Sequence, residues 1–390
     1  MPGSTTMGRS VGKIIVNICS PDPAIAEPWQ DLAGRAEANV FMNPAALAAA
    51  AATKFAKIHV LIAIDQSAQP NRAVGMWALQ EMGITPIGPA FLAGPPYNYA
   101  FVSSPVVDPA YLDEAIPAFF DAIENDPLLP NVIRLKCLDG DSKSYAAILK
   151  ALAARGSQKI LKLSERPRPY ASKESGQKRS GSTRKKLRQD WNRLSGLGAV
   201  DVANERAPGE VRDAFEIFLA MEAQGWKGAQ GTALLCSDQD AAFVRHLIGS
   251  LAAQGNASVA LLRVDGRAIA AQVLLYCGSL AYTWKTAFDP EYGKYSPGAL
   301  LVDRITEQLM AAGPIEAIES CSPEGGFMTQ LWDGRRTTVD LLVDVGAGKS
   351  LNFTVAAIGE RGYTRLRSLR DKLRAVSFLR PKRKRLMALR

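Results

Sequence analysis

The segment Tyr282–Leu309, which reads YTWKTAFDPEYGKYSPGALLVDRITEQL, contains residues suited to binding an anion. Its middle part, Ser296-Pro297-Gly298, is typical of a helix start, because serine caps helices and proline suits the first position. Gly298 has no side chain to cover the amides of the first turn. Unpaired N–H groups and the helix dipole attract phosphate at such a position. The segment therefore predicts a site for a phosphate-bearing ligand, such as a coenzyme.

A strand and a loop must bring this helix start into place. Tyr282, Trp284 and Thr286 alternate with the residues between them, which is the period-two pattern of a strand. The stretch Asp289–Tyr295 then breaks that pattern before the helix begins. Upstream, the sequence Val-Asp-Gly-Arg-Ala at residues 264–268 predicts a tight hairpin, because Asp-Gly supplies the positive φ that such a turn needs.

For proton transfer, the sequence offers carboxylates but no Ser/His/Asp arrangement. The only histidines, His59 in an apolar run and His246 on a predicted helix, are expected to be structural. Glu222 ends a predicted helix beside a Gly-Trp-Lys-Gly loop, and Glu319 ends a later strand. We expect one of these two carboxylates to act as a general base. For Glu222, the alternative is a surface charge or an ion pair with Lys227.

Length and composition predict a globular protein of about two domains. The chain has 390 residues, of which 47% are hydrophobic and 22% are charged. No apolar run approaches the ~18 residues of a membrane-spanning helix, and the start does not resemble a secretory signal. Five scattered cysteines show neither paired nor metal-ligand spacing, which favours a reducing cytoplasm and predicts no metal site.

The net charge of +9 is concentrated at the C-terminus. Residues 361–390 hold twelve Lys or Arg and one acid, so the rest of the chain is nearly neutral. Leu366, Leu369, Leu373 and Val376 recur there at helical spacing. A basic amphipathic helix of this kind suits an anionic membrane surface or an acidic partner. The alternatives are a last helix packed on the body and, least favoured, nucleic-acid binding.

A Pro-rich stretch in the middle of the chain predicts the domain boundary. Residues 166–181 contain two prolines and several serines and glycines, which are typical of a linker. We therefore expect an N-terminal domain at residues 1–165 and a C-terminal domain at residues 182–350. A basic amphipathic helix and tail would occupy residues 351–390.

A basic helix follows the predicted linker. It starts at Ser182 or Thr183 and places Leu187, Trp191 and Leu194 on one face. In the simplest interpretation its charged side is solvated. In a functional one, its basic residues attract an anionic substrate or the coenzyme phosphates.

The two halves of the chain share one order of predicted elements. Each has two helices, a hairpin, a third strand, a helix and another strand. In the second half, helices near residues 208–223 and 238–253 precede strands at residues 258–264 and 268–277. A duplicated α/β unit is the simplest explanation.

This order, with a strand that opens into a coenzyme-binding helix, resembles the plan of the GNAT acetyltransferases. The second half is more closely similar to the cellulose-biosynthesis acetyltransferase family (BcsL/CelD-type), a relative of the FemAB-like tandem GNAT proteins. The matching pieces are STRKKLRQDWNRLSGLGAV, FLAMEAQGWKGAQGTAL, LLRVDGRAIAAQVLLY and YTWKTAFDPEYGKYSPGALL. They cover roughly residues 180–345, and the first half matches by layout alone. The resemblance implies an α/β (α+β) fold of tandem GNAT-like domains, each a mixed twisted sheet flanked by helices.

The resemblance also implies a reaction and a set of site residues. An acyl group would pass from acetyl-CoA, or another acyl-CoA, to an amine or hydroxyl of a sugar or polysaccharide precursor. A thioester is already reactive, so the enzyme mainly positions the reactants and transfers protons, with Tyr292 or Tyr295 protonating the leaving thiolate. The residues expected to bind the coenzyme are Lys285, Ala287, Lys294, Ser296, Pro297, Gly298 and Ala299. Those expected to bind the acceptor are Trp226, Lys227, Trp284, Asp289 and Trp332. For Trp226, stacking on a sugar face and a plug in the core are both open.

One departure from the family leaves the donor open. GNAT proteins commonly carry a Gln/Arg-x-x-Gly-x-Gly/Ala loop at the phosphate site, whereas here the loop reads YGKYSPG at residues 292–298. FemAB-like relatives use aminoacyl-tRNA instead. A third hypothesis is a non-catalytic scaffold whose basic tail docks at a membrane synthase. We expect the protein in the cytoplasm or at the inner membrane face. The first half is expected to lack a coenzyme site of its own and to contribute its loop at residues 88–99 to the acceptor cleft.

Overall fold

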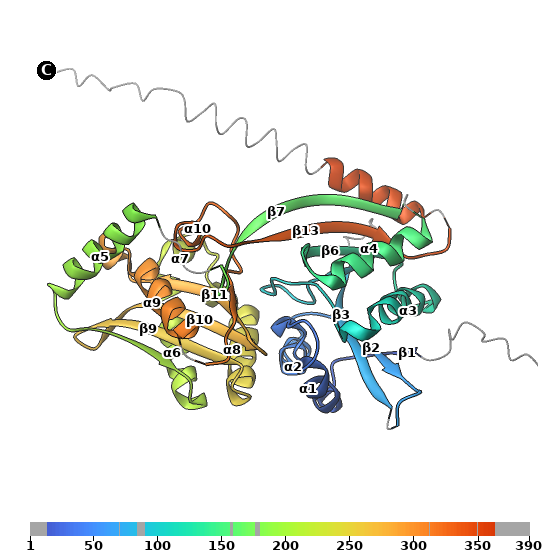
Figure 1. Ribbon diagram of the computed structural model, residues 1–390, viewed down its shortest axis with the longest axis horizontal. Coiled ribbons are helices and arrows are strands. Elements are labelled where there is room, and N and C mark those ends of the chain that lie inside the picture. The colour runs from blue at the N-terminus through green and yellow to red at the C-terminus, as the bar shows by residue number, and fades with distance from the viewer. Residues whose placement is uncertain are drawn as a thin grey trace, which may run out of the picture.

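The computed structural model describes residues 14–69, 71–83, 90–156, 159–175, 180–311, 313–348 and 350–362. Among these residues, 13 strands form one mixed sheet with helices packed on its faces (Figure 1). The strands of the first half are β1 Ile14–Cys19, β2 Ile58–Asp65, β3 Arg72–Met82, β4 Phe91–Gly94, β5 Val106–Val107, β6 Val132–Asp139 and β7 Ile160–Ser172. Its helices are α1 Ala26–Ala33, α2 Pro44–Ala52, α3 Leu112–Asn125 and α4 Lys143–Arg155.

The second half repeats the order of the first, as predicted. Its strands are β8 Val200–Glu205, β9 Ala257–Val264, β10 Arg267–Cys277, β11 Leu280–Phe288, β12 Ala317–Glu319 and β13 Arg335–Asp344. Its helices are α5 Gly181–Ser195, α6 Pro208–Gln224, α7 Trp226–Ala229, α8 Asp238–Ala253, α9 Pro297–Ala311 and α10 Met328–Leu331. Each half contains one parallel strand pair joined through a helix, β4 with β6 and β11 with β12.

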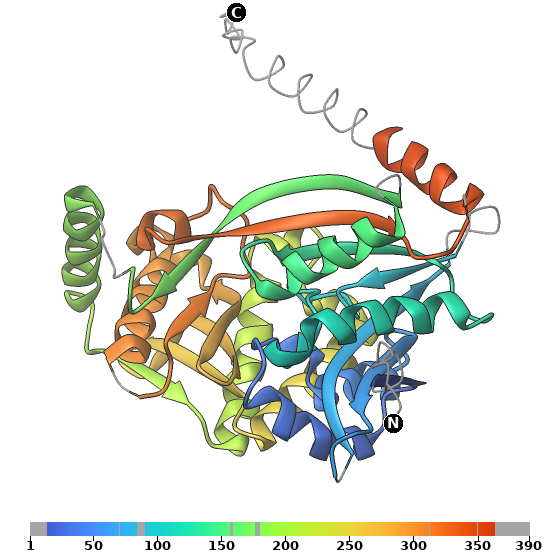
Figure 2. The ribbon, with the colours of Figure 1, turned by 45° about the vertical axis from the view of Figure 1, so that its right-hand side comes forward.

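Two long strands tie the halves into a single sheet. The strand order is β1-β2-β3-β4-β6-β13-β7-β12-β11-β10-β9-β8, with β5 paired to β3. Strand β13, the last strand among the described residues, is therefore inserted between β6 and β7 of the first half. The end of β7 in turn pairs with β12 of the second half. Figure 2 shows β7 and β13 running side by side across the molecule.

The predicted linker is wrong where it overlaps β7. Residues 166–172 pair with β13 and β12, so they are part of the sheet. Pro167 and Pro169 misled the prediction, since proline usually marks a loop. Their register partners lie on β13, and the pairing with β12 begins only at Tyr170. Proline is tolerated where one side of a strand is unpaired.

The apolar core continues from one half into the other. Helix α2 packs against α8, and the rings of Phe55 and Phe243 stack with centroids 4.1 Å apart. The hydroxyl of Tyr282 on β11 donates a hydrogen bond to the carbonyl of Ala38 at 2.8 Å. Asn43 Nδ2 donates to Gln254 Oε1 at 3.1 Å. These contacts hold β11 and the region of α8 directly against the first half.

Two local predictions from the sequence are confirmed. Asp265 and Gly266 both have positive φ, 48° and 79°, and connect β9 to β10 as a tight turn. On α5, Leu194 is buried, and Leu187 and Trp191 pack against the same core cluster. The apolar face of α5 is therefore the predicted one.

A helix at residues 351–362 follows β13 and lies against the first half of the sheet (Figure 2). The apolar residues predicted to form the basic C-terminal helix, Leu366 to Val376, lie outside the described residues. Within the described part of the chain, none of the helices has the length and apolar character needed to cross a membrane.

Candidate active site

The parallel strands β11 and β12 separate shortly after they begin to pair. Their pairing covers only Leu280–Tyr282 of β11, whereas β10 accompanies β11 along its whole length. At the point of separation, Thr283 Oγ1 donates to the carbonyl of Ser320 at 2.9 Å. A register shift in the β10 pairing leaves Trp284 as a bulge, which increases the local twist. The result is a wedge-shaped opening in the sheet.

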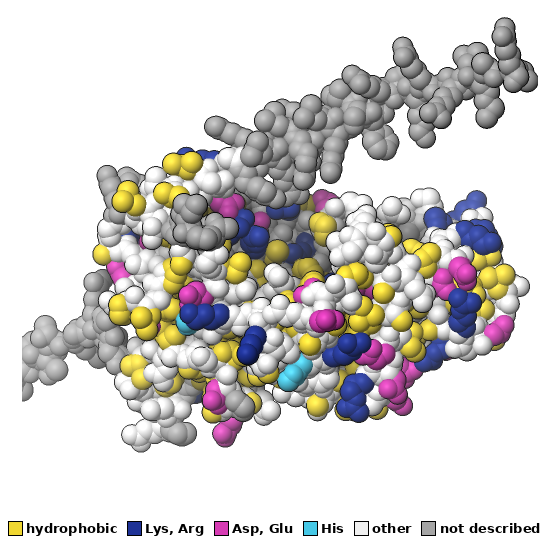
Figure 3. Space-filling view, turned by 180° about the vertical axis from the view of Figure 1, so that it is seen from behind, with side chains coloured by type: hydrophobic (Ala, Val, Ile, Leu, Met, Phe, Trp, Pro, Cys, Tyr) yellow, Lys and Arg dark blue, Asp and Glu magenta, His cyan; other side chains and the backbone are white. Residues whose placement is uncertain are grey.

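A cavity of about 580 Å³ lies at this opening. Its walls come from β11, the loop after β12, the start of α9, the short helix α7 and one residue of the first half. Figure 3 shows that the face opposite to Figure 1 is hollowed near its middle, with basic side chains (Lys or Arg) visible there. The basic residues that line the cavity are Lys227 and Lys285. The lining residues are Phe101, Trp226, Lys227, Thr283, Trp284, Lys285, Thr286, Phe288, Gly293, Ser296, Gly298, Ala299, Cys321, Ser322, Phe327 and Met328.

The start of α9 forms one wall of the cavity. Ser296 lies immediately before the helix, as predicted, with a φ of 53°. Its carbonyl accepts the N–H groups of Ala299 and Leu300, and its hydroxyl accepts a hydrogen bond from Lys186 Nζ at 2.9 Å. Gly298, whose amide belongs to the first turn, lines the cavity. A helix start beside a basic side chain is suited to an anionic ligand.

The basic helix α5 therefore lies next to this wall. Lys186 bridges Ser296 and Asp190, with its ammonium 2.6 Å from the Asp190 carboxylate. A second hollow of about 240 Å³ lies between α5 and α9. It is lined by Arg184, Leu187, Arg188, Trp191, Asn192, Leu300, Asp303, Arg304 and Glu307.

Lys285 is the basic side chain of the cavity with a strongly shifted pKa. Burial, together with the neighbouring charge of Lys227 on α7, lowers the pKa of Lys285 from 10.5 to about 8. Glu222 on α6 and Asp240 on α8 act in the opposite direction. The ammonium also lies 4.5 Å from the ring centroid of Tyr99. That ring favours the charged form, so burial and Lys227 outweigh it.

Glu222 does not line the cavity, and its carboxylate is already paired. It is 3% exposed, and its carboxylate is 2.6 Å from Lys227 Nζ and accepts the backbone N–H of Leu234 at 2.9 Å. The ion-pair alternative is therefore confirmed, whereas a surface charge is wrong. Glu222 fixes Lys227, and Lys227 lines the cavity beside Lys285.

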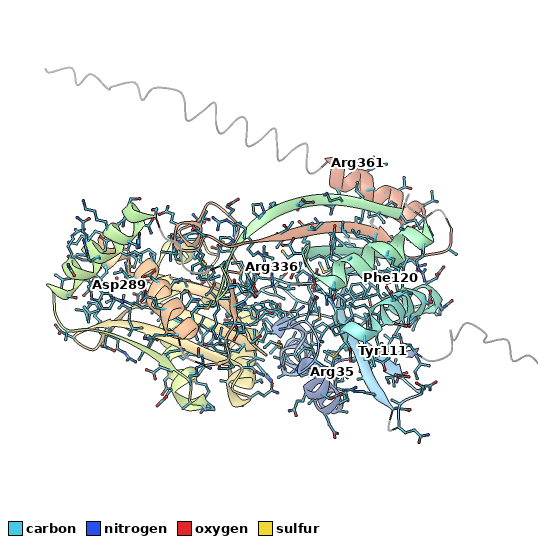
Figure 4. All side chains as sticks on the ribbon, in the orientation of Figure 1. Arg35, Tyr111, Phe120, Asp289, Arg336 and Arg361 are labelled. Atoms are coloured by element: carbon cyan, nitrogen blue, oxygen red, sulfur yellow. The ribbon has the colours of Figure 1, made fainter. Side chains whose placement is uncertain are left out.

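Glu319 is enclosed in the sheet between the two halves. It is fully buried, with Arg168 Nη1 at 3.5 Å from Oε1 and Arg336 Nη1 at 3.7 Å from Oε2. Arg336, which is labelled in Figure 4, also contacts Asp139 and the ring of Tyr170. Glu319 thus neutralises two arginines and does not line the cavity.

Several other predicted site residues have structural roles. Tyr295 is packed in the core and Tyr292 lies against it, so neither lines the cavity. Asp289 accepts the N–H of Glu291 and pairs with Arg267 at 2.7 Å. Trp332 is 2% exposed and donates to Thr306 Oγ1. Ala287, Lys294 and Pro297 also lie outside the lining.

Seven predicted residues do line the cavity, and they come from two segments. They are Trp226, Lys227, Trp284, Lys285, Ser296, Gly298 and Ala299. Trp226 is 62% exposed, so the alternative of a core plug is wrong. Trp284, in contrast, is nearly buried, and its indole N–H donates to the carbonyl of Tyr99 at 2.7 Å.

The sequence prediction missed the apolar part of the wall. Phe288, Phe327 and Met328 line the cavity, and only the partial exposure of the two phenylalanines distinguishes them from core residues. Phe101 of the first half also lines it, next to the loop that was expected to contribute. Cys321 is in the wall as well, but burial raises the pKa of its thiol well above the usual value, which keeps it protonated.

Comparison with known protein families agrees with this geometry. Residues 181–322 match the family model described as an acetyltransferase (GNAT) domain. The fold is GNAT-like. The match covers α5 to the loop after β12, which includes the splayed strands and the start of α9. It supports an acyltransferase, whereas the narrower cellulose-biosynthesis family stays a prediction.

Solved structures show the same fold over most of the chain. The chain is similar to FemX, with a TM-score of 0.59 and 10% identity, over 86% of this chain and 98% of FemX. It is also similar to a conserved protein of unknown function from Bacteroides thetaiotaomicron, with a TM-score of 0.51 and 10% identity, over 85% of this chain and all of that one. A search of curated proteins gave no match.

Proposed function

We propose that the cavity binds an acyl-CoA and that the protein transfers the acyl group to an amine or hydroxyl acceptor. One observation carries the proposal, namely the cavity at the separation of β11 and β12 with the start of α9 in its wall. A thioester chain would lie between the separated strands, and its pyrophosphate would lie against the start of α9 at Gly298. Acetyl-CoA is the simplest donor.

The chemistry needs a group that removes the acceptor proton. The acceptor nitrogen or oxygen attacks the thioester carbonyl carbon, the carbon–sulfur bond breaks, and CoA leaves as a thiolate that is then protonated. We infer that Lys285 accepts the acceptor proton, in place of the carboxylates predicted from the sequence. Lys285 lines the cavity, and its lowered pKa makes the neutral form of its amine accessible near neutral pH.

The exposed ring of Trp226 supports a sugar as the acceptor. It lines the cavity and is mostly exposed, with the ammonium of Lys227 6.0 Å from the ring centroid. An exposed indole offers a flat apolar surface that suits the face of a sugar ring. A polysaccharide precursor is therefore the proposed acceptor class.

An aminoacyl-tRNA donor is the second candidate, and one observation favours it. The basic helix α5 borders the start of α9 through Lys186 and Ser296. A polyanion longer than CoA would extend along that helix, and its binding would weaken steeply with salt.

Calorimetry with CoA and acetyl-CoA tests the proposal against both alternatives. Micromolar binding of either ligand, followed by release of free CoA thiol in the presence of an amino sugar, supports the acyl-CoA transferase. Binding of aminoacyl-tRNA without any binding of CoA would show that the donor is aminoacyl-tRNA and not acyl-CoA. Binding of CoA without turnover of any amine or hydroxyl acceptor would support the non-catalytic scaffold.

A further inference from the structure

The helix at residues 351–362 is anchored to the first half by one side only. Phe353, Ala356 and Ala357 on that side pack with Val132 of β6 and Leu342 of β13, which lie inside the sheet. Glu360, on the same side, pairs with Arg134 at 2.9 Å. The helix is therefore fixed in orientation, and its opposite side faces away from the sheet.

That opposite side is apolar and exposed. Leu351 is 83% exposed, Val355 is 56% exposed and Ile358 is 64% exposed. Spacings of four and three residues place them on a single face of the helix. We call these three residues the apolar stripe. Exposed apolar groups that line up on one helix face usually mark an interaction surface.

The sequence that follows the helix is basic and contains further apolar residues. After Ile358, the next apolar residues at helical spacing are Leu366, Leu369, Leu373 and Val376. Within residues 361–390, twelve Lys or Arg accompany one acid. Arg361, labelled in Figure 4, lies in the last described turn of the helix on the outer side of the molecule. Apolar and cationic groups thus occur together along one segment.

The charge of this segment identifies the partner that it fits. A second copy of the chain would bring two strongly basic segments together, which repel each other. An anionic bilayer offers both an apolar layer for the stripe and negative headgroups for the basic residues. We propose that the apolar stripe and the basic C-terminal segment dock the protein on an anionic membrane surface. This proposal does not depend on the transferase activity.

Flotation of the full-length protein with lipid vesicles tests the proposal. One set of vesicles contains phosphatidylcholine alone, and the other contains one third phosphatidylserine. We expect at least tenfold tighter binding to the anionic vesicles, and weaker binding as the salt concentration rises. Equal binding to both sets, or no binding to either, would overturn the proposal.

Two matched variants separate the stripe from a general charge effect. The triple variant Leu351→Ser, Val355→Ser, Ile358→Ser should lose at least tenfold in binding to anionic vesicles. The exposed polar variant Asn352→Ser, Thr354→Ser should bind like the wild type. Both should unfold at the wild-type temperature, since the changed side chains are exposed.

Light scattering and competition with poly-glutamate test whether another partner covers the stripe. If the triple variant binds vesicles as the wild type does, the stripe does not dock on lipid. If light scattering shows a dimer that the triple variant loses, a second copy covers the stripe and the membrane proposal is wrong. If poly-glutamate binds the wild type and the triple variant equally and displaces no vesicles, an acidic polymer is a separate partner and the membrane proposal stands.

Discussion

The replacement of Lys285 by arginine tests the proposed mechanism most directly. Arginine keeps the positive charge and much of the length of lysine, but it stays protonated under all ordinary conditions. If Lys285 only attracts the anionic donor, the variant should remain active. If its neutral amine accepts the acceptor proton, the variant should be nearly inactive.

The size of the effect follows from the lowered pKa. At pH 7.5, a lysine with the ordinary pKa of 10.5 is neutral in about 0.1% of molecules, and one with a pKa of about 8 in about a quarter. The cavity thus raises the neutral fraction by roughly two orders of magnitude. General base catalysis typically contributes 10²–10⁴-fold, so we expect Lys285→Arg to lower kcat/KM at least roughly a hundredfold.

The assay is the release of CoA thiol as a function of pH. A lowered lysine pKa means that the active neutral form is scarce below pH 8, so kcat/KM of the wild type should rise with pH and level off above about 8. Calorimetry should show that Lys285→Arg binds CoA within a few-fold of the wild type. Lys294→Arg, at an exposed position outside the cavity, is the matched control and should behave as the wild type. A profile that falls through pH 8, or an arginine variant with near wild-type kcat/KM, would refute the role of Lys285 as base.

Four further variants test the start of α9, the exposed tryptophan of the cavity and the buried Glu319 pairing. Gly298→Glu should weaken CoA binding by roughly a thousandfold in calorimetry, because a carboxylate ~4 Å from a phosphate costs about 4 kcal/mol at an effective dielectric constant of about 20. Gly298→Ala should bind normally, since a Cβ there would lie at an ordinary 3.5 Å from Thr286 and Phe288. Trp226→Ala should raise the KM for a sugar acceptor about tenfold with an unchanged CoA affinity, and an unchanged KM would exclude stacking. Glu319→Gln should lower the free energy of unfolding by ~3 kcal/mol in urea titrations, because the buried Arg168 loses its carboxylate, and wild-type stability would contradict the proposed pairing.

The sequence predicted the parts of the fold that depend on neighbouring residues. The Asp265-Gly266 turn, the apolar face of α5 and the start of α9 at Pro297 each follow from local backbone and side-chain preferences. The order of elements in the two halves also follows, since each helix and strand carries its own period. A strand followed by a short loop and a helix start is enough to place Lys285 and Gly298 in one region of the fold.

The pairing of β13 with β6 of the first half, and of β7 with β12 of the second half, was not predictable in this way. A strand shows its period but not its partner, and the partners of β13 lie far away along the chain. The prolines of β7 are compatible with a linker and with a strand that is paired on one side, so composition could not separate the two. The contribution of Phe101 to the cavity has the same cause, because it depends on how the halves pack.

The two carboxylates predicted as bases lie outside the cavity wall, and each contacts a cation. Glu222 holds Lys227, which lines the cavity and lowers the pKa of Lys285. Glu319 lies beside Arg168, whose Nη1 donates to the carbonyl of Phe101 at 2.9 Å, and Phe101 is the part of the wall supplied by the first half.

Each carboxylate therefore acts through a cation on a residue of the cavity wall. In the sequence, an acidic residue at the end of a helix or strand is equally compatible with a general base and with an ion pair that holds a cation in place. Only the positions of Lys227 and Arg168 separate these roles. Replacement of Glu222 should change the pKa of Lys285 and with it the pH dependence of turnover, whereas replacement of Glu319 should lower stability and leave that pH dependence intact.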